Sequence, residues 1–325
     1  MTSNNTNSSV NTRRTFLKKV AAYSAGLALA AQAASSAVWT KQVGLELYTV
    51  RDLLVDPKNY EATLAKIAAI GYKEVEPADQ HDSKGLGYAG LDPKGFRALL
   101  DRYGLSMPST HSNASEGPDL EKTLENFQIM GIQYTEIFAP RVGPHGPIGR
   151  SQPAAPTMDS AKRAAAQLNA HGELAKKFGI KLLVRMDPDQ FAPLAGHPDK
   201  RFFEVVLDNT EPALVTMQLD SGWASVLGLD IVGMFKRNPG RYEHWHIKDA
   251  AGIKRITPGM TVAERRQTAD LVPVGLGLID FKTIFASAKL AGLKHFCIEQ
   301  DNAAAWGDSI AAARVSYNNL VKMLS

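Results

Sequence analysis

Short apolar runs alternate with longer segments of helical period through most of this chain, and no other feature limits its fold as strongly. The eight runs lie at 43–47, 72–76, 106–111, 133–138, 181–187, 214–220, 242–248 and 295–301. Strands that alternate with helices are typical of βα units, which pair into a parallel sheet. The sequence therefore predicts eight consecutive βα units.

The segments between the runs carry the apolar spacing of helices that bury one face. They lie at 60–70, 94–103, 120–130, 160–178, 200–209, 229–236, 281–291 and 308–323. Glycine readily adopts the positive φ at which many helices end. It occupies five of the junctions between a helix and the next strand, at Gly71, Gly104, Gly131, Gly179 and Gly292. This regularity indicates one structural unit repeated along the chain.

Eight units in a body of about 285 residues match a (β/α)8 barrel, or TIM barrel, which normally takes about 250 residues. A doubly wound open sheet is the alternative. However, no Gly-x-Gly-x-x-Gly motif follows the first run, and no Walker phosphate-binding loop occurs. We therefore expect an α/β fold in which residues 38–325 form a single TIM-barrel domain.

The N-terminal residues 1–37 have the layout of an export signal. The basic stretch Thr-Arg-Arg-Thr-Phe-Leu-Lys-Lys begins at Thr12, and a small, apolar run at 20–34 follows it. Cleavage after Ala33 or Ala37 would fit the small-residue rule. A membrane anchor is the alternative, but the run is short and rich in Ala for a hydrocarbon core of about 30 Å. The segment resembles a twin-arginine signal, so we expect the twin-arginine machinery to export this protein to the periplasm.

The charge of the chain is concentrated in that segment. Its four basic residues, with no acid among them, account for the whole formal charge of +4 and leave the body neutral. A neutral body gives no electrostatic reason to expect a nucleic-acid partner. The single cysteine, Cys297, excludes an internal disulfide and a cysteine-rich zinc site.

Polar side chains stand at the ends of the last three runs, where a barrel exposes its chemistry. Side chains alternate along a strand, so residues two apart share a face. On this basis we expect the following to point to one rim: Asp220 from the sixth run, His244, His246 and Lys248 from the seventh, and Glu299 and Asp301 from the eighth. Oxygen and nitrogen donors from three successive strands suit Mn²⁺, Mg²⁺, Co²⁺ or Zn²⁺.

Earlier runs also end on polar residues. Arg185 and Asp187 share a face of the fifth run, Glu76 ends the second and His111 ends the third. Two irregular insertions, 140–158 and 250–278, follow the fourth and seventh runs, so they emerge at the same rim. We interpret them as substrate lids, with surface loops of no catalytic role as the alternative.

Six segments carry a resemblance to a known family. They are Val-Gly-Leu-Glu-Leu-Tyr-Thr-Val-Arg-Asp from Val43, Gly-Tyr-Lys-Glu-Val-Glu from Gly71, Leu-Asp-Ser-Gly-Trp from Leu219, His-Ile-Lys-Asp from His246, Val-Gly-Leu-Gly-Leu-Ile-Asp-Phe from Val274 and Ile-Glu-Gln-Asp from Ile298. Together they span nearly the whole body. In these segments the chain resembles the sugar phosphate isomerase/epimerase family, which consists of xylose-isomerase-like barrels.

The resemblance implies a divalent metal ion held by Asp220, His246 and Glu299. The family's fourth ligand comes from the fifth strand, where relatives often carry an ionisable ligand or a His-Asn-His run. This chain has Arg185-Met186-Asp187 instead. Asp187 could supply the missing carboxylate, whereas Arg185 could make the site cationic without a metal.

The resemblance also implies a reaction: isomerisation or epimerisation of an unphosphorylated sugar, by proton transfer next to a carbonyl through an enediolate. Glu299 would be a ligand and the base, and Glu76 a second acid/base. The residues expected to bind substrate are His111, Arg185, Lys248, Trp223 and Trp306, of which the two tryptophans would stack on the sugar.

Three other functions stay open at this point. The chain could be an exported carbohydrate-binding barrel without turnover, since Arg185 and Met186 depart from the family pattern. It could be a lyase or hydrolase that acts on keto-glycosides through the same enolate chemistry. A DNA-repair endonuclease is disfavoured by the neutral body and the export signal. The sequence also leaves open whether the protein is a homo-oligomer.

Overall fold

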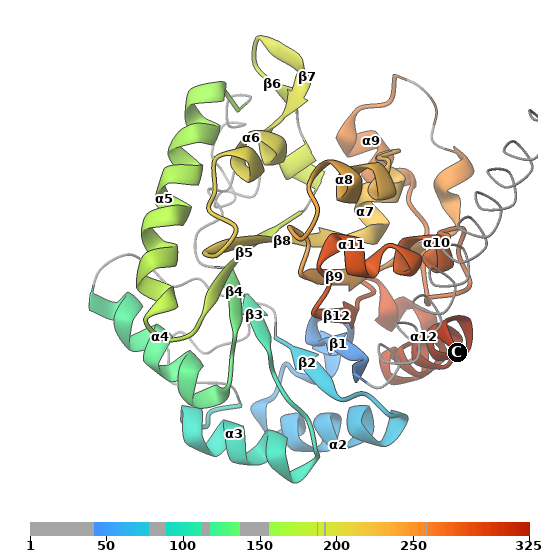
Figure 1. Ribbon diagram of the computed structural model, residues 1–325. Coiled ribbons are helices and arrows are strands. Elements are labelled where there is room, and N and C mark those ends of the chain that lie inside the picture. The colour runs from blue at the N-terminus through green and yellow to red at the C-terminus, as the bar shows by residue number, and fades with distance from the viewer. Residues whose placement is uncertain are drawn as a thin grey trace, which may run out of the picture.

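Eight parallel strands surrounded by helices form the body of the protein (Figure 1). The computed structural model describes residues 42–77, 89–111, 118–136 and 156–325, apart from positions 187, 192, 256 and 258. The barrel strands are β1 (Gly44–Glu46), β2 (Glu74–Glu76), β3 (Ser109–His111), β4 (Tyr134–Glu136), β5 (Lys181–Arg185), β8 (Val215–Asp220), β9 (His244–Ile247) and β12 (His295–Ile298). Each lies within one of the eight predicted runs, so the TIM-barrel prediction is confirmed.

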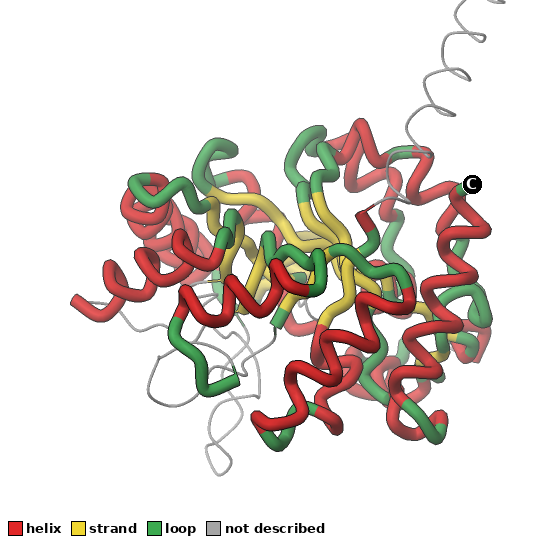
Figure 2. Tube along the Cα trace, turned by 90° about the horizontal axis from the view of Figure 1, so that it is seen from below, coloured by secondary structure: helices red, strands yellow, loops and turns green. Residues whose placement is uncertain are grey.

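The strands follow one another around the barrel in the order β2-β1-β12-β9-β8-β5-β4-β3. The two ends of this order, β2 and β3, meet through a single parallel bridge between Glu74 and Ser106. There the Val75 amide donates to the Ser106 carbonyl at 2.9 Å. Seen from below, the strands pass through the middle of the molecule and the helices lie outside them (Figure 2).

The predicted helices are also present, with ends shifted by a few residues. They are α2 (Tyr60–Ile70), α3 (Pro93–Arg102), α4 (Pro118–Met130), α5 (Met158–Lys176), α6 (Phe202–Asp208), α8 (Ile231–Arg237), α10 (Phe281–Ala286), α11 (Ala288–Ala291) and α12 (Ser309–Leu324). The segment predicted as one helix at 281–291 is divided at Ser287. All five junction glycines have positive φ, as the sequence predicted.

Several short elements were not predicted, because they are too brief to show a period. They are the hairpin of β6 (Pro193–Leu194) and β7 (His197–Arg201), the helix α7 (Ser221–Val226), and the turns η2 (Leu47–Leu53), η3 (Pro57–Asn59), η4 (Pro188–Phe191) and η6 (Ala303–Trp306). The α7 helix begins directly after β8, and the Asp220 carboxylate accepts a hydrogen bond from its Trp223 amide at 2.8 Å.

The insertion at 250–278 contains regular structure: β10 (Asp249–Ala250), η5 (Gly252–Arg255), α9 (Val262–Thr268) and β11 (Leu271–Val272), with β10 and β11 antiparallel. The buried Asp249 carboxylate fixes the C-terminal end of this insertion, because it accepts hydrogen bonds from the amides of Gly275 and Gly277, both at 2.9 Å. The expected export signal and most of the insertion at 140–158 lie outside the described residues.

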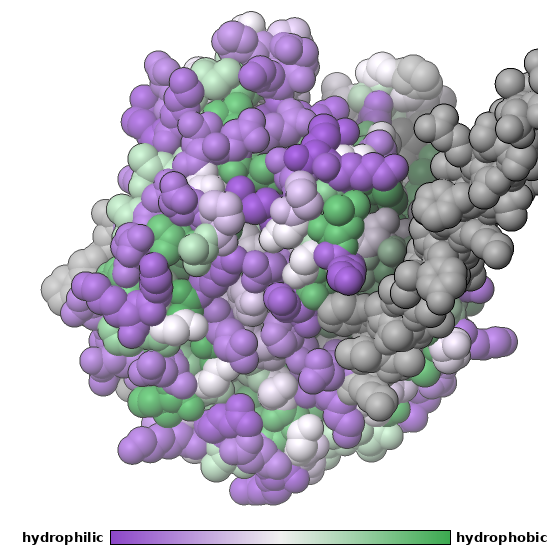
Figure 3. Space-filling view, in the orientation of Figure 1, coloured by the Kyte–Doolittle hydropathy of each residue, from purple (hydrophilic) through white to green (hydrophobic). Residues whose placement is uncertain are grey.

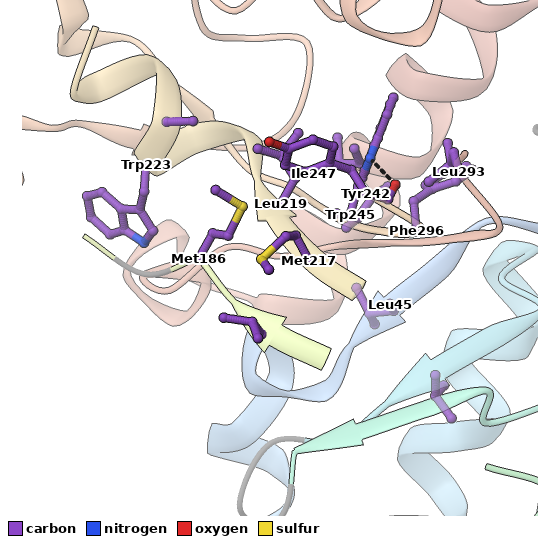
Figure 4. Packing of buried hydrophobic residues seen from close by; sticks show 14 of the residues in the cluster. Leu45, Met186, Met217, Leu219, Trp223, Tyr242, Trp245, Ile247, Leu293 and Phe296 are labelled. Atoms are coloured by element: carbon purple, nitrogen blue, oxygen red, sulfur yellow. Dashed lines mark hydrogen bonds between the residues drawn. The ribbon is translucent and has the colours of Figure 1, made fainter. Parts of the chain in front are cut away.

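The apolar core lies between the strands and the surrounding helices (Figure 4). There the Trp245 ring stacks on Phe235 with centroids 5.2 Å apart, and its indole nitrogen donates to the Tyr242 carbonyl at 3.0 Å. Hydrophilic residues predominate on the face shown in Figure 3. Among the described residues, no helix has the length and apolar character needed to cross a membrane.

Candidate active site

Three of the predicted ligands converge inside the mouth of the barrel. Asp220 ends β8 beside His246 of β9, and Glu299 follows β12 directly, with its amide bonded to the β9 carbonyl of Ile247. One ligand atom from each of Asp220, His246 and Glu299 lies within 4.8 Å of the others, and all three side chains are buried. The sequence prediction that these three residues meet is therefore confirmed in space.

The donor atoms of this cluster are held in charge pairs with their neighbours. His246 Nδ1 lies 2.8 Å from Glu299 Oε2, and Asp220 Oδ2 and Glu299 Oε2 each lie 3.2 Å from the Nζ of Lys248. Two buried carboxylate oxygens and an imidazole nitrogen that converge in this way fit a divalent cation.

Lys248 supplies a second positive charge beside the cluster. Its Nζ lies 3.2 Å from Asp220 Oδ2, 3.2 Å from Glu299 Oε2 and 2.7 Å from Asp301 Oδ1. The ammonium also lies over the Trp223 ring, 5.2 Å from its centroid. We refer to Asp220, Glu299, Asp301 and Trp223 as the lysine cage. It orients the ammonium group towards the same carboxylates that belong to the ligand cluster.

The residues of the motif Leu-Asp-Ser-Gly-Trp, at 219–223, pack against the Lys248 segment of the chain. Ser221 Oγ donates to the His246 carbonyl at 2.9 Å and accepts from the Lys248 amide at 3.2 Å. A Cβ at Gly222 would lie 2.8 Å from Lys248 Cβ and 2.9 Å from its Cγ, closer than real side chains allow. Glycine at 222 is therefore what lets Lys248 pass alongside α7.

Burial and these charges act in opposite directions on the ionisation of the site. Burial alone would lower the pKa of Lys248, but Asp220, Asp301 and Glu299 outweigh it and raise that pKa well above its usual range. Burial opposes ionisation of Glu299, yet Lys248 and His246 hold its pKa well below normal. Burial, with Glu299 nearby, raises the pKa of Asp220 to about 6. Lys248 is therefore a fixed ammonium and Glu299 a fixed carboxylate.

Glu76 and His111 lie on the other side of His246. Glu76 Oε2 is 2.7 Å from His246 Nε2, and its Oε1 accepts from Gln218 Nε2 at 2.8 Å. His111 Nε2 is 3.0 Å from Gln218 Oε1, and the ring is 2% exposed. Burial opposes ionisation of Glu76, but His244, His246 and His111 keep its pKa well below normal. Both residues thus belong to a buried polar layer beneath the ligand cluster.

The remaining predicted residues differ in where they lie. Arg185 is half-buried on β5 beside Gln218, and its charge contributes to the lowered pKa of Glu299. Asp187, the candidate fourth ligand, lies outside the described residues. Trp223 is buried in the lysine cage, whereas Trp306 on η6 is 49% exposed.

Two contributors to the site were missed in the sequence, and a third was given no role there. Gln218 joins Glu76 to His111, and Glu46 of β1 is buried with its Oε2 3.8 Å from His246 Nε2. Asp301, which the sequence placed on the same face as Glu299, makes the shortest of the three carboxylate contacts to Lys248. The alternation of side chains along a strand could have found the other two, because Gln218 stands two residues before Asp220 and Glu46 ends the first strand.

A family model describes most of this chain. The model for xylose isomerase-like TIM barrels matches residues 64–315. The chain belongs to this family. The match includes the three converging ligands, the lysine cage and the polar layer below them.

A curated relative is similar in sequence and several solved structures share the fold, all at low identity. Inosose dehydratase from Mesomycoplasma hyopneumoniae is 24% identical over 201 residues, which are 59% of this chain and 62% of the relative's length. A sugar phosphate isomerase/epimerase from Parabacteroides distasonis ATCC 8503 has a TM-score of 0.64 and 21% identity, covering 86% of this chain and 92% of its own. At these identities the structural likeness establishes the fold alone.

Two further structures are similar. An L-ribulose 3-epimerase has a TM-score of 0.62 and 15% identity, covering 87% of this chain and 94% of its own. A xylose isomerase-like protein from Mycobacterium smegmatis, in complex with magnesium, has a TM-score of 0.58 and 16% identity, covering 89% and 97%. The chain thus shares its architecture with barrels that include an epimerase and a magnesium complex.

Proposed function

We propose that this protein is a metal-dependent isomerase or epimerase of an unphosphorylated sugar or sugar derivative. The observation that carries the proposal is the convergence of Asp220, His246 and Glu299, whose buried ligand atoms lie within 4.8 Å of one another. Family membership and the epimerase neighbours support the choice of reaction.

Asp220, His246 and Glu299 would hold the ion, with Asp187 proposed as the fourth ligand. Oxygen and nitrogen donors of this kind suit Mn²⁺, Mg²⁺, Co²⁺ or Zn²⁺. Bound there, the ion would polarise a substrate carbonyl and stabilise negative charge on its oxygen. The magnesium complex of a neighbouring barrel supports a divalent ion in this fold.

The chain's own residues would carry out the proton transfer. Glu299, kept ionised by Lys248 and His246, would take the proton from the carbon next to the carbonyl and return it. The Lys248 ammonium, kept charged by its cage, would donate a hydrogen bond to the enediolate oxygen. Lys248 would thereby stabilise the negative charge that develops on the enediolate oxygen.

Substrate recognition would involve the rim as well as the centre. Trp306 is half-exposed beside β12, where its ring could stack on the apolar face of a sugar. Close by, Arg51 of η2 donates to the Asp301 carbonyl at 2.7 Å and lines an open cavity of about 540 Å³. We assign hydroxyl binding to Arg185 and a cage role to Trp223, whereas His111, which the sequence suggested for hydroxyl binding, belongs to the buried polar layer.

The test is hydrogen exchange into candidate keto sugars in deuterated water, followed by NMR, with and without Mn²⁺. We expect Mn²⁺-dependent exchange at a carbon next to the carbonyl, and its loss in Glu299→Gln. Glu125→Gln, at an exposed site on α4, is the control that should exchange like the unmodified protein. Tight binding of sugars without exchange in any of them would favour the carbohydrate-binding barrel instead.

A dehydratase or lyase is the second candidate, because the curated relative is an inosose dehydratase. Removal of the same proton, followed by departure of a group from the next carbon, would need the same Glu299 and Lys248. Loss of water or of an alcohol from a keto sugar or keto-glycoside in the NMR assay would identify this reaction.

We also propose export to the periplasm through residues 1–37. Replacing both Arg13 and Arg14 by Lys should leave the chain in the cytoplasm, because the twin-arginine pair is the feature that the signal resembles. Cell fractionation and immunoblotting measure this. An unchanged periplasmic fraction would contradict the proposal.

A further inference from the structure

The two nitrogens of His246 face different groups. Nδ1 lies 2.8 Å from Glu299 Oε2 in the ligand cluster, and Nε2 lies 2.7 Å from Glu76 Oε2 on the opposite side. The His246 and Glu76 side chains are fully buried. An imidazole that binds a metal ion is neutral, so only one of its nitrogens carries a proton, and the hydrogen bond made by that nitrogen decides which nitrogen is left to bind the ion.

We propose that Glu76 is a positioning residue, which accepts the Nε2 proton of His246 and thereby turns the Nδ1 lone pair towards the metal ion. The inference rests on the proposed function, because it concerns the same metal site. A carboxylate behind a ligating histidine fixes its tautomer and the orientation of its ring. Loss of such a partner typically weakens metal binding 10–100-fold.

Glu76 is itself fixed by a second hydrogen bond. Its Oε1 accepts from Gln218 Nε2 at 2.8 Å, and Gln218 Oε1 faces His111 Nε2 at 3.0 Å. Each carboxylate oxygen of Glu76 therefore has a partner already, which leaves it poorly placed to take a proton from substrate. The positioning role thus replaces the acid/base role expected from the sequence.

The same layer continues across the barrel. Gln218 Nε2 lies 3.2 Å from His244 Nδ1, and His244 Nε2 lies 2.8 Å from Ser109 Oγ. Side chains from β2, β3, β8 and β9 are linked in this way. Buried hydrogen bonds that are linked to one another hold their members more rigidly than isolated pairs do.

A second cation site is the alternative interpretation of this layer, since ligand atoms of Glu46, Glu76, His111 and His246 lie within 4.8 Å of one another. The hydrogen bonds argue against that reading. Glu76 uses both oxygens, and His111 and His246 each use Nε2, on partners within the network. Glu46 Oε2, 3.8 Å from His246 Nε2, is beyond hydrogen-bond distance, so Glu76 alone of the two carboxylates holds the ring.

Metal affinity tests this role without reference to activity. The whole chain is stripped with a chelator and titrated with Zn²⁺ by calorimetry, as the unmodified protein, Glu76→Gln and Glu74→Gln. Glu74 is a matched control, because it lies two residues earlier on β2 and pairs with His295 at 3.0 Å, away from the cluster. We expect Glu76→Gln to raise the Kd 10–100-fold and Glu74→Gln to leave it within about twofold.

A swap variant separates positioning from a general loss of packing. A glutamine side chain at 76 has one oxygen and cannot accept from both His246 and Gln218. In Glu76→Gln/Gln218→Glu the amide would donate to the new carboxylate and keep its oxygen for His246. The swap should therefore recover part of the lost affinity. If Glu76→Gln fails to fold, the Zn²⁺ affinity of the double variant, compared with that of the unmodified protein, still tests the positioning role.

NMR of the Zn²⁺-loaded protein gives a spectroscopic readout. We expect a slowly exchanging His246 Nε2 proton in the unmodified protein and in Glu74→Gln, and its rapid exchange in Glu76→Gln. Unchanged Zn²⁺ affinity in Glu76→Gln, or an equal loss in Glu74→Gln, would overturn the positioning role while the proposed function stands. If the unmodified protein binds neither Zn²⁺ nor Mn²⁺, the metal-dependent function and this inference fail together.

Discussion

The Lys248 ammonium is the positive charge that compensates three buried carboxylates of the site. Lys248→Met is therefore the most informative single change. Methionine has nearly the length of lysine and would pack against Gly222 and Trp223 in a similar way. The substitution removes the ammonium, whose Nζ lies 2.7–3.2 Å from carboxylate oxygens of Asp220, Glu299 and Asp301, and introduces no other positive charge.

The expected loss of stability follows from the burial of these groups. Breaking a buried ion pair from one side destabilises a protein by about 3–5 kcal/mol, since it leaves an uncompensated buried charge. Lys248 is 1% exposed and contacts three carboxylates, which favours the upper part of that range. For a chain of this size the change corresponds to a fall in Tm on the order of 10 °C.

Thermal unfolding of the metal-free protein, followed by circular dichroism, measures the effect. Lys181→Met is the matched control, because Lys181 lies on β5, its side chain is 19% exposed and its ammonium pairs with the Glu243 carboxylate. It should lower stability by only about 1 kcal/mol. Adding Mn²⁺ should raise the Tm of Lys248→Met more than that of the unmodified protein, since the ion then meets no competing ammonium.

Equal Tm values for Lys248→Met and Lys181→Met would refute the reasoning. That result would mean that the three carboxylates are already neutral, or already solvated, when Lys248 is present. A Mn²⁺ effect of the same size in both proteins would refute the competition between the ammonium and the ion.

Three further predictions concern neighbouring residues. Burial, with His246, His295 and His111 nearby, lowers the pKa of His244 to about 3, so the contribution of neutral His244 to stability should be complete above pH 6.5 and be lost towards pH 3. Chemical denaturation should show a shallower fall in His244→Gln, and an identical slope would contradict the burial argument. Gly222→Ala should lower stability by about 1–3 kcal/mol through its clash with Lys248, which a Tm shift near zero would disprove. Asp249→Ala should release the amides of Gly275 and Gly277, so their hydrogen exchange should quicken; unchanged protection would show that another group holds this loop.

The barrel was predictable because every unit repeats the same local signals. Positive φ at Gly71 and Gly292, for example, follows from the chain itself, since each ends a helix that the apolar spacing already delimits. The convergence of Asp220, His246 and Glu299 was predictable for a related reason. Parallel strands bring their C-terminal ends to one rim, whatever the intervening helices are.

The contacts of the individual side chains were less accessible to sequence reasoning. Trp223 looks like a sugar-stacking residue until its position over the Lys248 ammonium is known. Glu76 looks like an acid/base until His246 and Gln218 are seen to occupy both of its oxygens. Alternation identifies which residues face the interior, but the partner of each depends on the stagger between strands and on rotamers, which no single strand specifies.

Four bonds of the polar layer run between β2 or β3 and β8 or β9, joining residues 107 to 170 positions apart. While the chain is being synthesised, Glu76 and His111 therefore lack the partners Gln218 and His246 until the ribosome has added more than a hundred further residues. Before then the first four βα units can satisfy these two groups only with each other or with water. We therefore expect the dry interior to form only after β9 has emerged, as a late step in folding.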